Sequence, residues 1–158
     1  LKSLVFGIAD FTASIGAPLT TLSAHGEDDT SNHSGHRWHY ILNRIVTAAK
    51  SHGLYAIDAP YGNFQDEEGL IDSARMSRLL GFDGKWVIHP GQISIVNEAY
   101  SPSEHEIELA KQILEAHKEA EINGRGAASK EGHMIDNATV RLAEKVWEFA
   151  IQLGNIAS

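Results

Sequence analysis

The sequence lacks cysteine altogether, so disulfide bonds and thiolate metal sites are excluded. A chain without cysteine suits a reducing compartment, and we expect a cytoplasmic protein. Long hydrophobic runs are absent as well, which argues against a membrane partner. The apolar start at residues 1–9 is too short for a secretory signal and has no small-residue cleavage site.

Basic residues are scarce. Lys and Arg number 13 against 21 Asp and Glu, which gives a formal net charge of −8. A nucleic-acid-binding protein needs a concentrated basic surface, so we expect no nucleic-acid partner. The 42% of hydrophobic residues is enough for a buried core and is typical of a globular protein. Because the chain has no initiating Met and opens inside a predicted strand, we expect it to be part of a longer protein.

Strand and helix patterns alternate in the first hundred residues. Short apolar segments predict buried parallel strands, and helical periodicity separates them. Gly53 and Gly81 are predicted to stop the two helices. This alternation is typical of a parallel α/β fold. The predicted strands cover residues 4–10, 54–59 and 85–89, and the predicted helices cover residues 37–52 and 66–80.

The last third of the chain has a different pattern. After a predicted helix at residues 92–100, Ser101 and Glu104 predict a capping box with Pro102 at the first helical position. Residues 123–132 hold three glycines and predict a hinge or loop, and residues 136–153 predict a final amphipathic helix. We therefore predict two parts, residues 1–100 with the strands and residues 101–158 as a helical extension and lid.

Three parallel strands cannot close a barrel, and they leave two unpaired edges. We expect these strands to belong to a larger sheet or to pack against another copy. Ligands of parallel α/β folds gather where strands end, which singles out Asp10, Asp58 and His89.

Each of these residues has a functional and a structural interpretation. Asp10 is either a ligand of a hard metal ion or the cap of the next turn, and spacing favours the cap. The same choice applies to Asp58, where Pro60 and Gly62 favour a turn. His89 is an acid, a ligand or a satisfied donor, and a positioning role is favoured over catalysis.

Two further segments contain side chains that could bind a metal ion or take part in catalysis. His33, His36 and His39 could bind zinc, but their polar, glycine-containing surroundings favour a surface loop. Asp136 follows the glycine-rich segment and precedes the last helix. It is either an N-cap or a carboxylate that a mobile lid delivers to a site, and spacing favours the cap.

Taken together, the segments resemble malyl-CoA lyases of the citrate lyase beta-subunit-like aldolase superfamily, and the resemblance runs from end to end. The segments at residues 57–69 and 84–92 are the most specific. The segments that carry the resemblance are FGIADFTASIG at residues 6–16, Trp38-His39-Tyr40, IDAPYGNFQDEEG at 57–69, GKWVIHPGQ at 84–92, Ser101-Pro102-Ser103-Glu104 and GHMID at 132–136.

The resemblance implies an α/β fold, namely the C-terminal part of a TIM (β/α)8 barrel plus a C-terminal helical lid. The three strands would be the sixth, seventh and eighth of the barrel. The absent half would carry a second metal-binding carboxylate, an arginine that stabilises an enolate, and part of the CoA pocket. We therefore expect the isolated segment to be inactive.

The resemblance also implies a site. Asp10 would be a Mg²⁺ ligand, with Mn²⁺ as an alternative ion, and the Ala9 and Asp10 amides would lie near the glyoxylate carboxylate. Ile88 and His89 would contact the CoA-bearing substrate. Asp136 would be the catalytic acid/base, supplied by the lid of a neighbouring subunit, which implies a homo-oligomer.

The implied reaction is the reversible cleavage of malyl-CoA, and of methylmalyl-CoA, to glyoxylate and acetyl-CoA or propionyl-CoA. Alternatives within the family are a malyl-CoA thioesterase and a citramalyl-CoA lyase. An alternative of another class is a non-catalytic metal-binding or assembly module that uses the histidine segment.

Overall fold

The computed structural model describes residues 1–23, 37–123, 128–130 and 132–156. It divides into two compact units, Leu1–Tyr100 and Ser101–Ser158. The first unit contains the strands of a parallel sheet, and the second is mostly helical. That the second unit acts as a lid stays a prediction.

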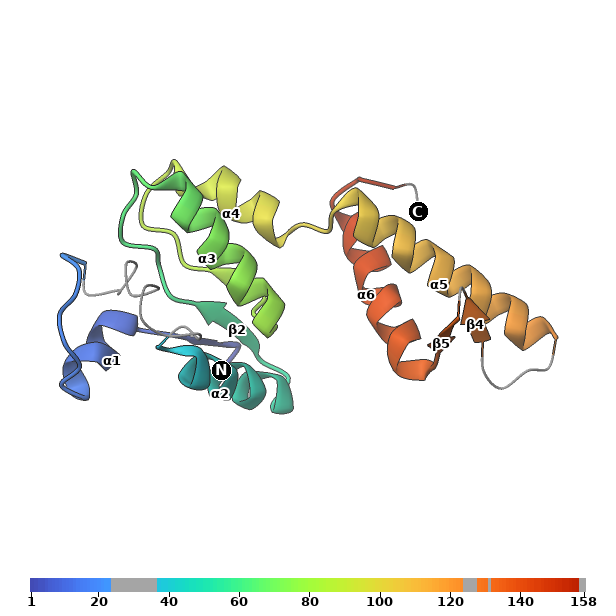
Figure 1. Cartoon of the computed structure of the whole chain (residues 1–158), viewed down its shortest axis with the longest axis horizontal. Helices are drawn as coiled ribbons and strands as arrows, with labels where there is room; N and C mark the ends of the chain where they lie inside the picture. The colour runs from blue at the N-terminus through green and yellow to red at the C-terminus, as the bar shows by residue number, and fades with distance from the viewer. Residues whose placement is uncertain (24–36, 124–127, 131, 157–158) are drawn as a thin grey trace. The chain divides into compact units, whose positions relative to one another are not determined.

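A three-stranded parallel sheet, in the order β1-β2-β3, forms the centre of the first unit (Figure 1). Helices connect its strands, as the alternating sequence pattern predicts. Helix α2 packs on β1 and β2, whereas α3 and α4 pack on β3 and on each other. The elements are β1 (Ser3–Val5), α1 (Ile8–Ser14), α2 (His39–Ser51), β2 (Tyr55–Asp58), α3 (Glu67–Leu80), β3 (Gly84–Lys85) and α4 (Gln92–Tyr100).

The strands are shorter than the sequence pattern predicts. β1 ends at Val5, so the prediction of a strand through Asp10 is wrong. After Gly7 the burial pattern becomes helical, with Ile8 and Thr12 buried one turn apart. β3 ends at Lys85, and residues 86–89 form a loop in place of the predicted strand.

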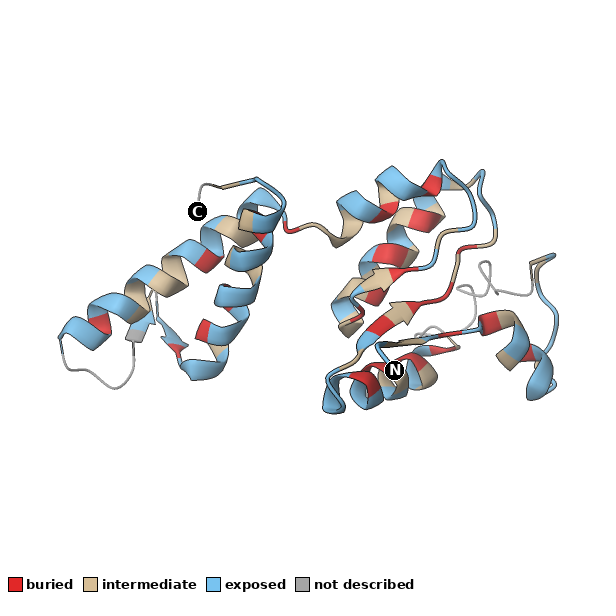
Figure 2. Ribbon diagram, turned by 180° about the vertical axis from the view of Figure 1, so that it is seen from behind, coloured by how far each residue is buried: buried red, intermediate tan, exposed pale blue. Residues whose placement is uncertain are grey.

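The main core of the first unit lies between α2 and the sheet. Small residues there let the helix approach the strands: Ala49 and Ala56 are fully buried. At one end, the rings of Phe6, Phe11 and Trp38 form a cluster with centroids 5.6 to 6.4 Å apart. Figure 2 shows buried positions in the strands and on the helices. The buried cluster comprises Phe6, Ile8, Trp38, Leu42, Val46, Ala49, Ala56, Ala59 and Phe82.

Helix α3 has clear start and stop signals. The Asp66 side chain accepts a hydrogen bond from the Gly69 N–H at 3.0 Å and thereby caps the first turn. Gly81 ends the helix with a φ of 97°, a left-handed conformation that glycine adopts without strain. The predicted stop at Gly81 is confirmed.

The second unit pairs two helices with a short hairpin. Helix α5 (Glu104–Ile122) packs along α6 (Asn137–Gln152), and the antiparallel strands β4 (Ala128–Lys130) and β5 (His133–Ile135) connect them. The sequence predicts only a hinge or loop over residues 123–132, and the hairpin corrects this. A small core holds the unit together, comprising Ala120, Ile135 and Val140 with Ile113, Leu114 and Ala116 packed against them.

The capping box of α5 is real but lies two residues later than predicted. Ser103 is the N-cap and its hydroxyl accepts from the Glu106 N–H at 3.2 Å, while Glu106 accepts from the Ser103 N–H at 2.8 Å. Pro102 therefore precedes the cap and is not the first helical residue. No helix in the described part of the chain is long and apolar enough to cross a membrane.

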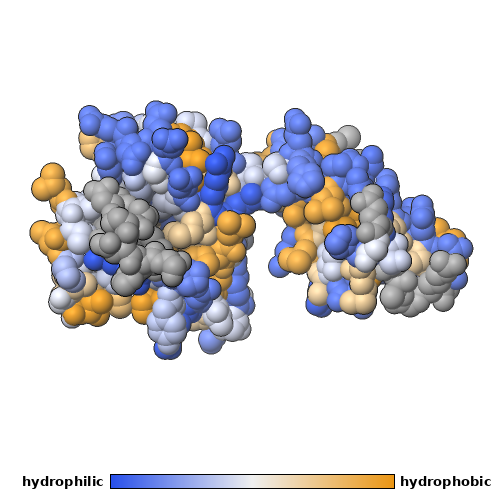
Figure 3. Space-filling model, viewed as in Figure 1, coloured by the Kyte–Doolittle hydropathy of each residue, from blue (hydrophilic) through white to orange (hydrophobic). Residues whose placement is uncertain are grey.

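Some large apolar side chains remain exposed. Hydrophobic side chains (orange) reach the visible surface of both units among hydrophilic ones (Figure 3). In the first unit the exposed large apolar residues include Val5 and Tyr55, which lie on adjacent strands. Parallel sheets are normally covered on both faces, so the expectation that these strands belong to a larger sheet or pack against another copy stays a prediction.

Candidate functional site

The carboxyl ends of β1, β2 and β3 lead into the three segments that carry the predicted site residues of the first unit. Ala9 and Asp10 follow β1, the segment at residues 59–66 follows β2, and Ile88 and His89 follow β3. Because the strands are parallel and adjacent, these segments leave the sheet at the same edge.

Asp10 lies in the first turn of α1, where an acid is favoured by the helix dipole. Gly7 is the N-cap of this helix and makes no side-chain cap, so the prediction that Asp10 caps a turn is wrong. The Asp10 side chain is exposed, and no hydrogen bond or ion pair to its carboxylate is found among the described residues. A carboxylate in this state can bind a cation without first losing another partner.

No group of three or more metal-binding side chains occurs in the described part of the chain. Asp10 therefore offers one ligand, which suits a hard ion that retains waters and substrate oxygens better than it suits zinc. His33 and His36 lie outside the described residues. His39 is the exposed first residue of α2.

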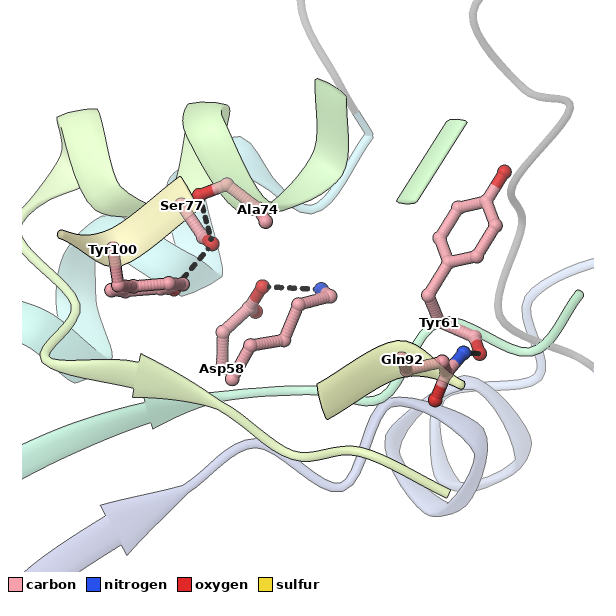
Figure 4. Close-up of polar contacts among 7 residues, drawn as sticks. Asp58, Tyr61, Ala74, Ser77, Gln92 and Tyr100 are labelled. Carbon is pink, nitrogen blue, oxygen red and sulfur yellow. Dashed lines mark hydrogen bonds and ion pairs between the residues drawn. The ribbon is translucent and has the colours of Figure 1, made fainter. Parts of the chain in front are cut away.

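Asp58 has a role that neither sequence interpretation covers. It is the last residue of β2 and is buried, and Lys85 Nζ lies 2.7 Å from its Oδ2 (Figure 4). The two residues are directly paired in the register of β2 and β3. The lysine that begins the predicted strand at residues 85–89 is the signal that could have indicated this pair.

The hydroxyl of Tyr100 lies near the carboxylate of Asp58 (Figure 4). It donates to Ser77 Oγ at 2.6 Å, because the Ser77 hydroxyl proton is directed to the Ala74 carbonyl at 3.1 Å (Figure 4). Burial raises the pKa of Tyr100, and the nearby Asp58 carboxylate adds to that increase. Tyr100 is thus a neutral, hydrogen-bonded core residue that joins α4 to α3.

Gln92 connects the segments after β2 and β3. Its side chain is 1% exposed, and Nε2 donates to the Tyr61 carbonyl at 2.9 Å (Figure 4). Its Oε1 accepts from the Ile88 N–H at 3.0 Å. The Ile88 amide is therefore already engaged. Any ligand contact of Ile88 has to use its carbonyl or its half-exposed side chain.

The segment after β2 is also tied to α3. The Tyr61 hydroxyl donates to Asp66 Oδ2 at 2.6 Å. This bond, followed by the one from the Gly69 amide, lowers the pKa of Asp66. The ring of Phe64, from the same segment, stacks on the His89 ring with centroids 4.9 Å apart and planes 18° apart.

Asp136 is the N-cap of α6, as its spacing predicts. Its Oδ1 accepts from the Ala138 and Thr139 amides, both at 2.9 Å, and from Thr139 Oγ1 at 3.0 Å. The Thr139 bonds come first among the causes that lower the pKa of Asp136, and Arg141 contributes as well. The carboxylate is exposed and ionised, and no partner of Oδ2 is found among the described residues. Oδ2 is thus available to accept a proton.

Three comparisons bear on the chain's identity. A model of the C–C bond lyase family of the TIM-barrel fold matches residues 21–152. The L-malyl-CoA/beta-methylmalyl-CoA lyase of Cereibacter sphaeroides is 37% identical over 151 residues, which are 92% of this chain and 48% of the relative. The mitochondrial citramalyl-CoA lyase of Rattus norvegicus is 38% identical over 153 residues, which are 97% of this chain and 42% of the relative.

A solved structure gives the same result for the fold. The CitE protein of Mycobacterium tuberculosis, in complex with magnesium, acetoacetate and coenzyme A, matches with a TM-score of 0.74 and 30% identity over 92% of this chain and 51% of CitE. The chain thus spans about half the length of the relatives it matches. Its three parallel strands with their helices form part of a barrel. The chain belongs to the C–C bond lyase family of the TIM-barrel fold.

Proposed function

We propose that this chain is the C-terminal part of a Mg²⁺-dependent lyase that reversibly cleaves malyl-CoA, and methylmalyl-CoA, to glyoxylate and acetyl-CoA or propionyl-CoA. The 37% identity to the L-malyl-CoA/beta-methylmalyl-CoA lyase of Cereibacter sphaeroides carries the proposal. Two exposed carboxylates support it. Asp10 has no described partner, and Asp136 has one oxygen without a described partner.

Asp136 is the proposed acid/base. In the condensation direction its Oδ2 removes a proton from the carbon next to the thioester. The enolate then forms the new carbon–carbon bond to the aldehyde carbon of glyoxylate, and the electron pair of the aldehyde carbonyl moves to its oxygen, which takes up a proton from water. In cleavage the hydroxyl gives this proton back to water as the carbon–carbon bond breaks, and the protonated Asp136 returns its own proton to the enolate carbon. One carboxyl group serves both directions.

Asp10 is the proposed metal ligand of this part of the protein. Mg²⁺ is commonly bound by one or two carboxylates together with waters and substrate oxygens, and an exposed, unpaired carboxylate fits that donor set. A bound Mg²⁺, or Mn²⁺ in its place, would act as a Lewis acid toward glyoxylate. The Ala9 and Asp10 amides lie in the first turn of α1, where backbone N–H groups have no carbonyl partner within the helix, and they would hold the glyoxylate carboxylate.

The second unit, residues 101–158, is the proposed lid, and we propose that it supplies Asp136 to a neighbouring subunit of a homo-oligomer. Mixed oligomers of the full-length protein test this. Asp10→Ala and Asp136→Asn subunits are each expected to be inactive alone. After mixing and subunit exchange, activity should return, because some sites then combine an intact Asp10 with an intact Asp136. Mixtures that stay inactive although exchange is complete would refute delivery between subunits.

Asp136→Asn tests the acid/base role directly. It keeps the N-cap geometry but cannot take up the proton, so kcat should fall by about 100- to 10,000-fold, the usual contribution of a general acid/base. Affinity for Mg²⁺ and CoA, measured by calorimetry, should remain close to wild type. A variant that loses Mg²⁺ binding, or that keeps normal turnover, would show that the roles are misassigned.

A citramalyl-CoA lyase is the second candidate, supported by the 38% identity to the rat enzyme. Product analysis of the full-length protein distinguishes the candidates. Malyl-CoA should give glyoxylate and acetyl-CoA, whereas citramalyl-CoA should be cleaved faster if the second candidate is correct. Release of malate and free CoA would instead indicate a malyl-CoA thioesterase.

A further inference from the structure

Tyr100 is the last residue of α4 and of the first unit, and both its ring and its hydroxyl are held in place. The ring packs against the main cluster between α2 and the sheet, and also against a second cluster of Tyr61, Leu70 and Val96. The hydroxyl donates to Ser77 Oγ at 2.6 Å, and Ser77 is fully buried in α3 (Figure 4). Burial raises the pKa of Tyr100, so the hydroxyl keeps the proton that it donates.

This hydrogen bond fixes the part of α4 that would otherwise open most easily. The last turn of a helix frays because its final four carbonyls lack partners within the helix. In α4 that turn ends at Tyr100, whose side chain bonds to a serine in the interior of the unit. Removing the bond would raise the population of the opened turn by about 2- to 10-fold, the value of one hydrogen bond.

The connection from α4 to the next capped helix is short and stiff. α4 ends at Tyr100, and Ser103 is already the N-cap of α5, with its own capping box. Between them, Pro102 has a fixed φ and restricts Ser101 to extended conformations. Few backbone torsions are therefore free between the two helices, so a change at the end of α4 passes into α5.

Asp136 lies at the end of the second unit that is far from the first residue of α5. Ala120, near the end of α5, packs with Ile135, the residue before Asp136. The end of α6 returns to the start of α5, where Asn155 and Glu104 line one cavity. Helix α5 rises about 24 Å from Glu104 to Ala120. A rotation of about 5° at its start would thus move Asp136 by about 2 Å, and a misplacement of about 1 Å can cost about 100-fold in rate.

We infer that Tyr100 is a positioning residue of the proposed lyase: its hydrogen bond to Ser77 anchors the point from which the second unit carries Asp136 to the acyl-CoA. This inference rests on the proposed function. Neither Tyr100 nor Ser77 has to touch a substrate, and both act through Asp136. The anchor limits the directions that α5 can take from the end of α4. A larger fraction of the bound complexes then has Asp136 within reach of the proton that it removes.

Kinetics of the full-length enzyme in the condensation direction test the inference. Tyr100→Phe removes the hydroxyl and keeps the ring, and Ser77→Ala removes the acceptor. Each should lower kcat by about 2- to 10-fold and leave KM for glyoxylate unchanged, because the proposed glyoxylate contacts lie in the first unit. The double variant should lose no more than either single variant, since both changes break the same bond. Tyr40→Phe removes a hydroxyl that accepts from Arg44 on the surface of α2, and as the matched control it should leave kcat unchanged.

The Asp136→Asn background separates positioning from a purely structural role. A residue that acts only through Asp136 has no proton acceptor left to position in this background, so adding Tyr100→Phe should not reduce the residual kcat further. A loss by the same factor in both backgrounds would overturn the inference. A wild-type kcat in Tyr100→Phe would overturn it as well, even if urea unfolding shows that the variant is less stable.

Distances between spin labels in the full-length protein give a readout that does not depend on activity. Residues 1–158 contain no cysteine, so Arg75→Cys on α3 and Lys118→Cys on α5 place labels at two exposed positions. In pulsed EPR of labelled subunits diluted with unlabelled ones, the distance distribution should be broader in Tyr100→Phe than in wild type, and unchanged in Tyr40→Phe. Equal widths in all three would overturn the inference. The expected broadening in a protein whose wild type cleaves no acyl-CoA would support the anchor and refute the proposed function.

Discussion

The buried ion pair between Asp58 and Lys85 predicts a large loss of stability when one partner is removed. The two side chains are 6% and 3% exposed, and their charged atoms lie 2.7 Å apart. Lys85→Met therefore leaves a buried carboxylate without its counter-ion. Removing one partner of a buried pair costs about 3 to 5 kcal/mol. Lys85→Met should lower the free energy of unfolding of the first unit by that amount.

A second, more exposed ion pair provides a reference for this loss of unfolding free energy. Lys50 and Asp83 also form a salt bridge, but their side chains are 44% and 29% exposed. Lys50→Met should therefore cost only about 0.2 to 1 kcal/mol. Asp58→Leu combined with Lys85→Met removes both buried charges, so the double variant should lie within about 1 kcal/mol of wild type.

Hydrogen exchange at a single amide reports the effect locally. The Trp86 N–H donates to the Asp58 carbonyl at 3.0 Å, beside the ion pair, and its protection follows the opening of β2 from β3. Urea unfolding gives the matching global value. The reasoning is refuted if Lys85→Met costs no more than Lys50→Met. It is also refuted if the double variant loses the sum of the two single losses, because the two charges would then be uncoupled.

Two more predictions concern the N-caps of α6 and α3. Thr139 lowers the pKa of Asp136, so Thr139→Val should raise that pKa. In the proposed mechanism condensation needs ionised Asp136, so the acid limb of its pH profile should move to higher pH. Thr139→Ser should keep the wild-type profile, and an unchanged profile in both variants would contradict the role of the hydroxyl. A Cβ at position 69 would overlap the hydroxyl of Tyr61 and the Asp66 carboxylate, so Gly69→Ala should cost about 1 to 2 kcal/mol in urea unfolding, despite the better helix propensity of alanine. A neutral or stabilising result would show that Tyr61 moves freely.

Features that depend on local spacing could be predicted from the sequence. The alternation of strands and helices, the stop at Gly81 and the N-cap at Asp136 each follow from a few neighbouring residues, and the structure confirms them. The sequence predicts that a capping box is present but does not fix its position, because Ser101–Glu104 and Ser103–Glu106 both match the pattern. Backbone geometry selects the second pair, since Ser103 has the extended conformation of an N-cap.

Features that depend on contacts between distant segments could not be predicted. The apolar run before Asp10 fits either one long strand or a strand followed by a helix, and packing of the aromatic cluster against α2 decides for the helix. The Asp58–Lys85 pair requires the register of two strands. The Phe64–His89 stack and the Gln92 bridge require that two loops lie beside each other, which no local pattern encodes.

The Gln92 bridge limits how the loops at residues 59–66 and 86–92 can be engineered. The Gln92 side chain joins both loops, so replacing one loop alone would leave this buried amide without one of its hydrogen-bond partners. Burying an unsatisfied amide costs free energy of folding. Productive chimaeras should therefore exchange residues 59–66 and 86–92 as a matched set. The two loops thus form one structural unit, linked through the side chain of Gln92.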